Sequence, residues 1–291
     1  MLSSKHILIL RRPANMHDDK ILGYQPGNSF IHHLNATTKL IFLILVSIAC
    51  MVTYDTRFLA VICLFSLICL KIAGIKWKQV SFVVNFIIVF AIINIIAVFI
   101  FQPTYGQDLY QTKHVLISAG YFTVTQEELF YLLNVILKYI CSIPLVLLFL
   151  LTTNPSQFAS SLNKIGVSYK IAYAVSLALR YIPTVQTDYW EISAAQQARG
   201  NELSKKAHLG KRIKGTLNIV MPLIFSSLDR IDIISTAMQL RRFGSKKKRT
   251  WYVYEPFQLK DYLVTALAFI LVLVVVVLWH VNSGRFFNPF R

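Results

Sequence analysis

The chain has 291 residues, of which 55% are hydrophobic and only 15% charged, and its mean hydropathy is +0.55. This composition excludes an ordinary soluble domain and predicts a polytopic membrane protein, because several apolar runs approach the ~20 residues that cross a bilayer as a helix. The net charge of +17 would suggest nucleic acid in a soluble protein, but the basic residues cluster between the apolar runs and no nucleic-acid-binding motif occurs. We therefore expect contact with the lipid bilayer and its anionic headgroups, and no contact with nucleic acid.

The apolar runs predict five membrane crossings, four in the N-terminal half and one near the C-terminus. They cover approximately residues 39–54, 58–75, 80–101, 129–151 and 262–279. The first two runs are short, so the depth and tilt of these helices stay open.

The distribution of charge predicts how these crossings are oriented in the cell membrane. Lys and Arg are frequent before the first crossing, between the second and third, and after the fourth, whereas the loop 102–128 has only Lys113 against three acidic residues. The positive-inside rule therefore places the N-terminus and the segment after the fourth crossing in the cytoplasm, and the loop and the C-terminus outside.

Three features in or beside the crossings could carry chemistry. Lys138 lies within the fourth crossing, where a charge marks a functional site by default, although we favour a snorkelling side chain. Pro144 is expected to kink the same helix. His32 and His33 are adjacent and cannot share a helix face, and the four cysteines lack metal-ligand spacing, so we expect neither a metal nor a cofactor.

Residues 152–258 are too polar to lie in lipid throughout and too apolar for a disordered linker. Asn154 and Pro155 predict a helix start, which Gly166 would end. A helix from about 169 to 180 is expected to break at Pro183.

The sequence thus predicts an all-α polytopic membrane protein with a cytoplasmic coupling region of long amphipathic helices. We divide the chain into three parts: residues 1–151, 152–258 and 259–291.

Two further helices of this region end in the same short pattern, A-x-Q-[A/L]-R-[G/R]. The first copy is AQQARG at 195–200, and the second is AMQLRR at 237–242, at the end of a helix that starts near residue 217 or 222. A basic residue is stabilised at a helix C-terminus, and a following glycine allows the left-handed conformation that ends a helix. One copy would be an ordinary helix cap, but two copies at matched positions favour two projecting docking tips with a planar guanidinium.

At these residues the sequence resembles the transmembrane T component of energy-coupling factor (ECF) transporters, which import vitamins and transition-metal ions. The resemblance covers the chain from about residue 29 to the last crossing. It is carried by TTNP at 152–155, LALRYIP at 177–183 and the two arginine patterns. It implies a non-catalytic subunit whose tips dock into grooves on two ABC-type ATPase subunits, and whose coupling helices cradle a small membrane substrate-binding S component.

Carried over to this sequence, the resemblance implies six docking residues: Ala198, Arg199, Gly200, Leu240, Arg241 and Arg242. The second pattern departs from Ala-Arg-Gly, because Arg242 stands where the glycine is expected. We expect Gly244 to end that helix instead, and Arg241 rather than Arg242 to be the docking arginine.

Three other functions compete with this interpretation. The permease of a conventional ABC importer would need more polar residues along a path through the crossings. A membrane-embedded enzyme would need clustered His, Asp or Glu at the membrane boundary, and the chain has neither that nor a phosphate-binding loop. A scaffold that binds cytosolic proteins without transport is the third alternative.

Overall fold

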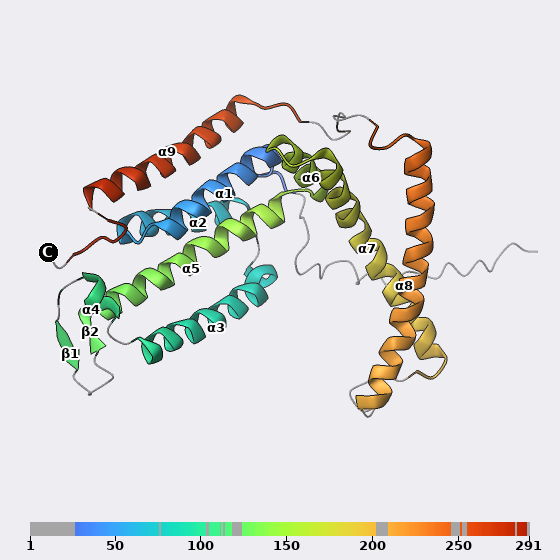
Figure 1. The fold of residues 1–291 in the computed structure, drawn as a ribbon, viewed down its shortest axis with the longest axis horizontal. Helices are drawn as coiled ribbons and strands as arrows, with labels where there is room; N and C mark the ends of the chain where they lie inside the picture. Colours follow the sequence, from blue (N-terminus) through green and yellow to red (C-terminus); the bar gives the residue numbers. More distant parts are fainter. Residues whose placement is uncertain are drawn as a thin grey trace, which may run out of the picture. The chain divides into compact units, whose positions relative to one another are not determined.

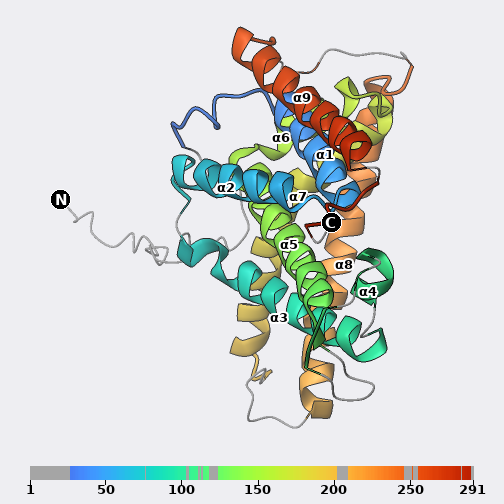
Figure 2. The same cartoon turned by 90° about the vertical axis from the view of Figure 1, so that its left-hand side faces the viewer.

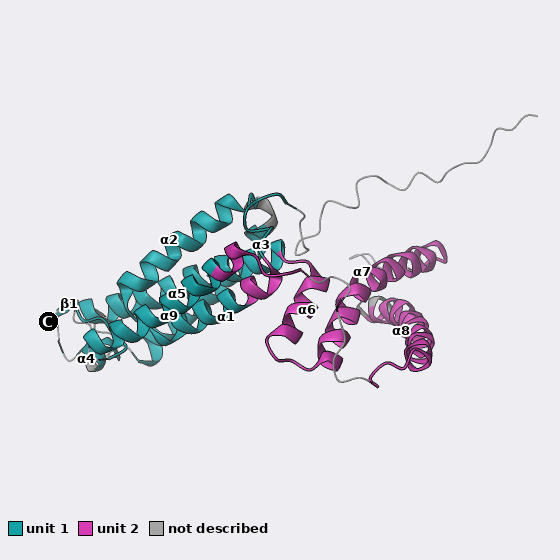
Figure 3. Ribbon diagram, turned by 90° about the horizontal axis from the view of Figure 1, so that it is seen from above, with its two compact units in different colours: residues 1–34, 41–152, 263–291 teal, residues 35–40, 153–262 magenta. Residues whose placement is uncertain are grey.

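The computed structural model describes residues 27–289, apart from 76, 103–104, 111, 113, 118–123, 202–208, 246–250, 252–254 and 283. The basic residues expected before position 27, at 205–206 and at 246–249 lie outside this described part. The chain forms two compact units (Figure 3), one of which holds Ile41–Thr152 and Leu263–Arg291, and the other Asn35–Leu40 and Thr153–Tyr262.

The first unit contains the predicted membrane helices, packed side by side around two apolar clusters, the smaller of which joins α3 to α5 (Figures 1 and 2). These helices are α1 (Ala36–Val52), α2 (Thr56–Ile72), α3 (Trp77–Phe101), α5 (Gln126–Thr152) and α9 (Leu259–Val281). The larger cluster includes Val46, Leu59, Ile62 and Cys141, which are all at most 1% exposed. Many apolar side chains of α3 point outward, with Phe82 and Phe86 each 69% exposed, as lipid-facing residues do.

Three of the five predicted crossings are helices long and apolar enough to span a bilayer: Val80–Phe101 in α3, Gln126–Thr152 and Leu259–Val281. The helices α1 and α2 have 17 residues each. Each is about 25 Å long at a rise of 1.5 Å per residue, somewhat less than a hydrocarbon core of about 30 Å. The prediction of a polytopic helical membrane protein is confirmed, and the crossing of α1 and α2 stays a prediction.

The loop between α3 and α5 has more structure than a polar loop requires. It forms the short helix α4 (Tyr105–Tyr110) and a two-stranded antiparallel pair, β1 (Val115–Ile117) and β2 (Val124–Thr125). The side chain of Glu128 accepts a hydrogen bond of 2.8 Å from the Gly106 amide, which holds α4 against the start of α5.

Lys138 has a structural role in the first unit. Its Nζ donates a 2.8 Å hydrogen bond to the carbonyl of Met51 and lies 3.2 Å from the ring centroid of Tyr54. The side chain therefore meets the carbonyl groups left without helical partners at the end of α1. We favoured a snorkelling side chain on a helix that starts later than residue 129, but α5 starts earlier, at Gln126, and Lys138 meets the end of a neighbouring helix. Pro144 lies inside α5, which continues through it.

The second unit contains α6 (Pro155–Lys164), α7 (Tyr169–Ala198) and α8 (Leu209–Leu240). The start of α6 is as predicted, because the Asn154 side chain accepts a 3.0 Å hydrogen bond from the amide of Ser156. Glu255 ties this helix to the chain before α9, since its carboxylate accepts a 2.6 Å hydrogen bond from Gln157 and its carbonyl one of 3.1 Å from Lys164. Burial lowers the pKa of Lys164 below its usual value.

Two predicted boundaries in this unit are wrong. We expected Pro183 to break a helix near residue 180, but α7 is one helix of 30 residues that passes through it. A proline removes one backbone hydrogen bond, which a long and otherwise packed helix can lose. We expected the next helix to start near 217 or 222, but α8 starts at Leu209 and holds Pro222 in its interior, so it includes part of the predicted basic linker.

The helices α7 and α8 run antiparallel and pack against each other (Figure 1). Near the end of α7, the Asn201 side chain donates a 3.2 Å hydrogen bond to the carbonyl of Gly215, early in α8. Just after the end of α8, Phe243 packs on Tyr173, early in α7, with ring centroids 4.6 Å apart. The end of each helix therefore lies beside the beginning of the other, which places the two arginine patterns at opposite ends of the pair.

Candidate functional site

The first candidate tip, residues 198–200, ends α7 in a Schellman motif. Arg199 is the C-cap, and Gly200 follows with a φ of 85°. The Gly200 amide donates to Gln197 O at 2.9 Å, and the Asn201 amide donates to Gln196 O at 3.0 Å. These two bonds satisfy carbonyls that have no partner inside the helix. The predicted role of Gly200 as the residue that stops this helix is confirmed.

The second candidate tip, residues 240–242, ends α8 in the same way. The Arg242 amide donates to Gln239 O and the Phe243 amide donates to Met238 O, both at 2.9 Å. Arg241 therefore occupies the position of Arg199, and Arg242 the position of Gly200. Arg242 has a φ of 52°, in the left-handed region that costs a non-glycine residue roughly 1–2 kcal/mol.

The expectation that Gly244 ends α8 is therefore wrong. Gly244 does have a φ of 87°, but it lies in the turn after the helix, and the stop is made two residues earlier by Arg242. Arginine can occupy the position because its Cβ is tolerated there at a modest cost and because the two Schellman hydrogen bonds fix the backbone.

Both tips present their side chains to the outside of the second unit. Arg199, Arg241 and Arg242 are exposed, and Leu240 is 81% exposed, an unusual position for a large apolar side chain. The two arginines at equivalent C-cap positions lie at opposite ends of the antiparallel pair. Since Asn201 lies beside Gly215, this contact at the first tip and Arg241 are about 40 Å apart along α8 at a rise of 1.5 Å per residue.

The two tips are anchored differently, which the sequence patterns did not indicate. After the second tip, an aromatic cluster is formed by Tyr169, Tyr173, Phe243 and Trp251, with centroid distances of 4.6–5.7 Å. The Trp251 indole also donates a 3.2 Å hydrogen bond to the Asn163 side chain of α6. At the first tip, the corresponding link is the hydrogen bond of Asn201 to Gly215. The dense aromatic content around 169–173 and 243–251 is the only sequence signal for this cluster.

Replacing Phe243 with alanine is expected to loosen the second tip and leave the first unchanged. Loss of its ring contacts should cost about 2 kcal/mol, the scale of two aromatic pairs with partial burial. Hydrogen exchange of the amides of Arg242 and Phe243 should then accelerate at least tenfold. Phe225→Ala is the control, because Phe225 is a 59% exposed ring on α8. Equal exchange rates in both variants would contradict the anchoring role.

A second exposed feature of α8 is an apolar stripe along one side of the helix. Its residues recur every three or four positions and are 45–63% exposed: Ile213, Leu217, Met221, Ile224, Leu228 and Ile231. Such spacing places all six side chains within about 80° around the helix axis. An exposed apolar surface of this kind marks a contact with protein or membrane.

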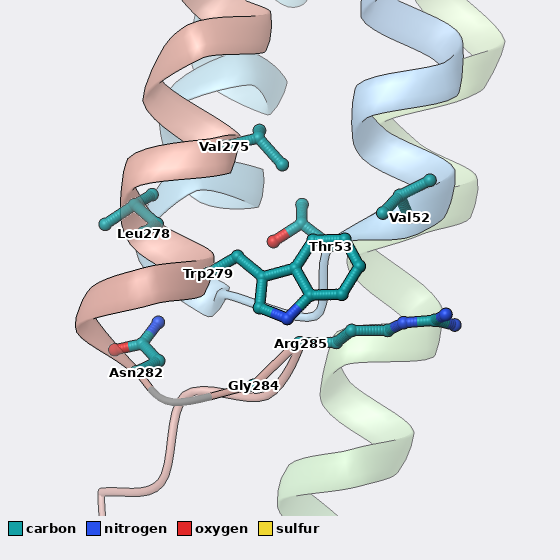
Figure 4. A pocket seen from close by; sticks show the side chains of 8 residues that line it. All are labelled: Val52, Thr53, Val275, Leu278, Trp279, Asn282, Gly284 and Arg285. Carbon is teal, nitrogen blue, oxygen red and sulfur yellow. The ribbon is translucent and has the colours of Figure 1, made fainter.

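The described residues offer little for ligand or metal chemistry. Within them, no group of three or more His, Cys, Asp or Glu side chains could hold a metal ion. The indentation in Figure 4 lies at the end of α9 and is filled by its own side chains, with the Trp279 indole at its centre and the Arg285 guanidinium 5.4 Å from that ring. Asn282 in the same group donates a 2.8 Å hydrogen bond to Asp55.

These observations define the class of the protein: a helical membrane protein that carries a pair of long helices with two exposed, equivalent arginine ends. Comparison with known families makes the assignment more specific. A family model described as "CbiQ: Cobalt transport protein" matches residues 27–252. The chain belongs to this family.

Similar curated proteins are energy-coupling factor transporter transmembrane proteins, named EcfT. The protein from Streptococcus equi subsp. equi is 30% identical over 87% of this chain and 94% of its own length. Those from Lactococcus lactis subsp. cremoris and Staphylococcus aureus are 27% and 28% identical, over 88% and 84% of this chain and 96% and 92% of their own lengths. The predicted resemblance to the T component is confirmed.

Proposed function

We propose that this chain is the membrane-embedded coupling subunit of an ECF-type importer for a micronutrient, a vitamin or a transition-metal ion. The observation that carries the proposal is the pair of Schellman-capped helix ends with Arg199 and Arg241 at equivalent positions, in a chain of this family. The subunit is non-catalytic. Two partner ABC-type ATPase subunits hydrolyse ATP, and the movement that they produce enters this chain at the two tips.

Each tip docks by inserting one guanidinium into an acidic groove of an ATPase subunit. A guanidinium is always charged and can bind a carboxylate through two parallel hydrogen bonds. Exposed Leu240 adds an apolar contact at the second tip, where Ala198 occupies the same position at the first. The two tips thus have different chemistry beside the same arginine, which suits two non-identical ATPase subunits.

The apolar stripe of α8 is the surface that we assign to the S component. Six exposed apolar side chains in one line fit the apolar surface of a small membrane protein, as an amphipathic helix fits an apolar groove. This assignment places the two partner classes on different parts of one helix, the ATPase at its end and the S component along its side. Movement of the tip is then transmitted directly to the substrate-binding partner.

Ile231→Glu is expected to remove the S component from the purified complex and to leave the ATPase subunits bound. A carboxylate placed in an apolar interface is desolvated without a partner, which costs at least about 3 kcal/mol, or over a hundredfold in affinity. The matched control is Ile233→Glu, because Ile233 is also an exposed isoleucine and lies about 200° away around the helix. The measurement is copurification followed by mass spectrometry.

The outcomes of this experiment separate the alternatives for the stripe. Loss of the S component in Ile231→Glu but not in Ile233→Glu supports the assignment. Retention of the S component in both variants would contradict the assignment. The function itself is tested by uptake: cells that lack this chain should lose ATP-dependent uptake of at least one vitamin or metal ion, and uptake that stays normal would contradict it.

A further inference from the structure

One ion pair joins the middle part of α7 to the middle part of α8. The Nη2 atom of Arg230 lies 2.8 Å from Oδ2 of Asp188, with hydrogen-bond geometry. The two side chains are 34% and 21% exposed, so the pair is partly shielded from water. Interactions of partly buried charges are screened less by solvent and salt than those of exposed pairs.

The position of this ion pair is symmetric with respect to the two tips. Asp188 precedes Arg199 by eleven residues, and Arg230 precedes Arg241 by eleven residues. At a rise of 1.5 Å per residue, the pair lies about 16 Å from each tip. Contacts on either side of it, Asn201 with Gly215 and Phe243 with Tyr173, show that the helices are antiparallel along this whole length.

A third residue restricts the arginine. The guanidinium carbon of Arg230 lies 5.9 Å from the ring centroid of Tyr181, which is seven residues before Asp188 and therefore on the same side of α7. Arg230 is thus held by a carboxylate and by an aromatic ring from two turns of one helix. Two such contacts fix the direction as well as the position of the side chain.

We propose that Asp188 and Arg230 are positioning residues that form the pivot of the coupling pair. The pivot sets the angle at which α7 and α8 cross and so sets the distance between the two tips. This inference rests on the proposed function, because it assigns to the pair the task of presenting both tips at the spacing that two ATPase subunits require. Asp188 and Arg230 touch no partner themselves and act through Arg199 and Arg241.

A symmetric pivot has a mechanical consequence. Because both tips are the same distance from it, rotation of either helix about the pivot by 10° displaces the tip of that helix by the same amount, about 3 Å at a radius of 16 Å. Movement of one ATPase subunit is therefore transmitted to the other tip through the ion pair. An asymmetric contact would instead move one tip more than the other.

The test measures the distance between two positions near the tips, one on each helix, in the purified complex of the full chain with its partners. Nitroxide labels are attached at Ala194→Cys and Thr236→Cys, two exposed positions that each precede a tip arginine by five residues. Three native cysteines are buried, and the half-buried Cys69 is replaced by serine. Double electron–electron resonance then reports the distribution of distances between the labels.

We compare Arg230→Gln, the charge swap Asp188→Arg with Arg230→Asp, and the control Asp229→Asn, which changes an exposed neighbouring carboxylate. Arg230→Gln should shift or broaden the distribution, whereas the swap and the control should give that of the unaltered chain. Uptake should fall about fivefold in Arg230→Gln, which is the lower end of the usual range for coupling between two sites. The rate of ATP hydrolysis by the complex should stay within about twofold of the rate of the unaltered complex.

An unchanged distribution in Arg230→Gln would overturn the pivot, and so would a changed distribution that the swap does not restore. These results are separable from a failure of the proposed function. If the distance responds as expected but uptake is normal when the tip arginines are reversed, the pivot stands and the docking role is wrong.

Discussion

Reversing the charge at both tips, Arg199→Glu with Arg241→Glu, is expected to abolish ATPase binding and ATP-driven uptake. Each reversal places a carboxylate against an acidic groove in a contact from which water is excluded. Loss of such a charged contact costs about 2–5 kcal/mol, which is more than removal of one exposed charge would cost. With both tips altered, copurification of the ATPase subunits should fall below detection.

The matched control reverses two exposed charges away from the tips, Arg180→Glu on α7 and Lys71→Glu on α2. The control changes the net charge by the same amount as the tip variant. Any loss of ATPase binding or uptake that both variants show is therefore a long-range electrostatic effect. Each single reversal should weaken one ATPase contact and leave the other. Normal uptake by the doubly reversed chain would contradict the docking role of the tips.

Replacement of Arg241 and of Arg242 should have opposite consequences, although the two arginines are adjacent. Arg242→Gly should be tolerated or stabilising, because glycine adopts the observed φ of 52° without strain and the motif then becomes Leu-Arg-Gly. The expected gain is about 1 kcal/mol in the free energy of unfolding. Arg241→Gly should reduce uptake at least tenfold, because it removes the guanidinium that is equivalent to Arg199.

Both variants carry the same substitution, remove one positive charge and lie one residue apart, so each is the control for the other. Uptake and ATPase copurification are measured together with thermal unfolding. If Arg242→Gly loses uptake and Arg241→Gly keeps it, Arg242 is the docking arginine, and the backbone equivalence between the two tips has no functional meaning.

Much of the fold follows from local signals in the sequence. Long apolar runs predicted the helices that are able to span a membrane, since a lipid environment requires an apolar segment of a definite length. Asn154 predicted the start of α6, and Gly200 the end of α7, because each is selected by the hydrogen-bonding needs of a helix end. These features depend on a few neighbouring residues, so a single sequence contains enough information.

The errors arise where a local rule is overridden by the surrounding structure. Pro183 and Pro222 were expected to limit helices, but both lie inside helices of 30 and 32 residues, whose many other hydrogen bonds and packing contacts outweigh one lost bond. Arg242 was expected to continue the helix toward Gly244, but it takes the left-handed conformation itself.

The contacts that define the coupling pair could not be predicted from local patterns, because their partners are far apart in the chain. Phe243 meets Tyr169 and Tyr173 only because α7 and α8 are antiparallel. The equal spacing of Asp188 and Arg230 from the two tips is visible in the sequence, but it acquires meaning only once the two helices are known to pack together. The two arginine patterns do lie at equivalent helix ends, and the docking role of their residues stays a prediction.

The most direct test of the account is purification of this chain from its native membrane in a mild detergent, with identification of the bound proteins by mass spectrometry. We predict recovery of two ABC-type ATPase subunits together with a small, very hydrophobic membrane protein, whose ligand then identifies the imported micronutrient. Recovery of the chain without any ATPase, in a detergent that preserves other ABC complexes, would contradict the account and would leave Arg199 and Arg241 as helix caps.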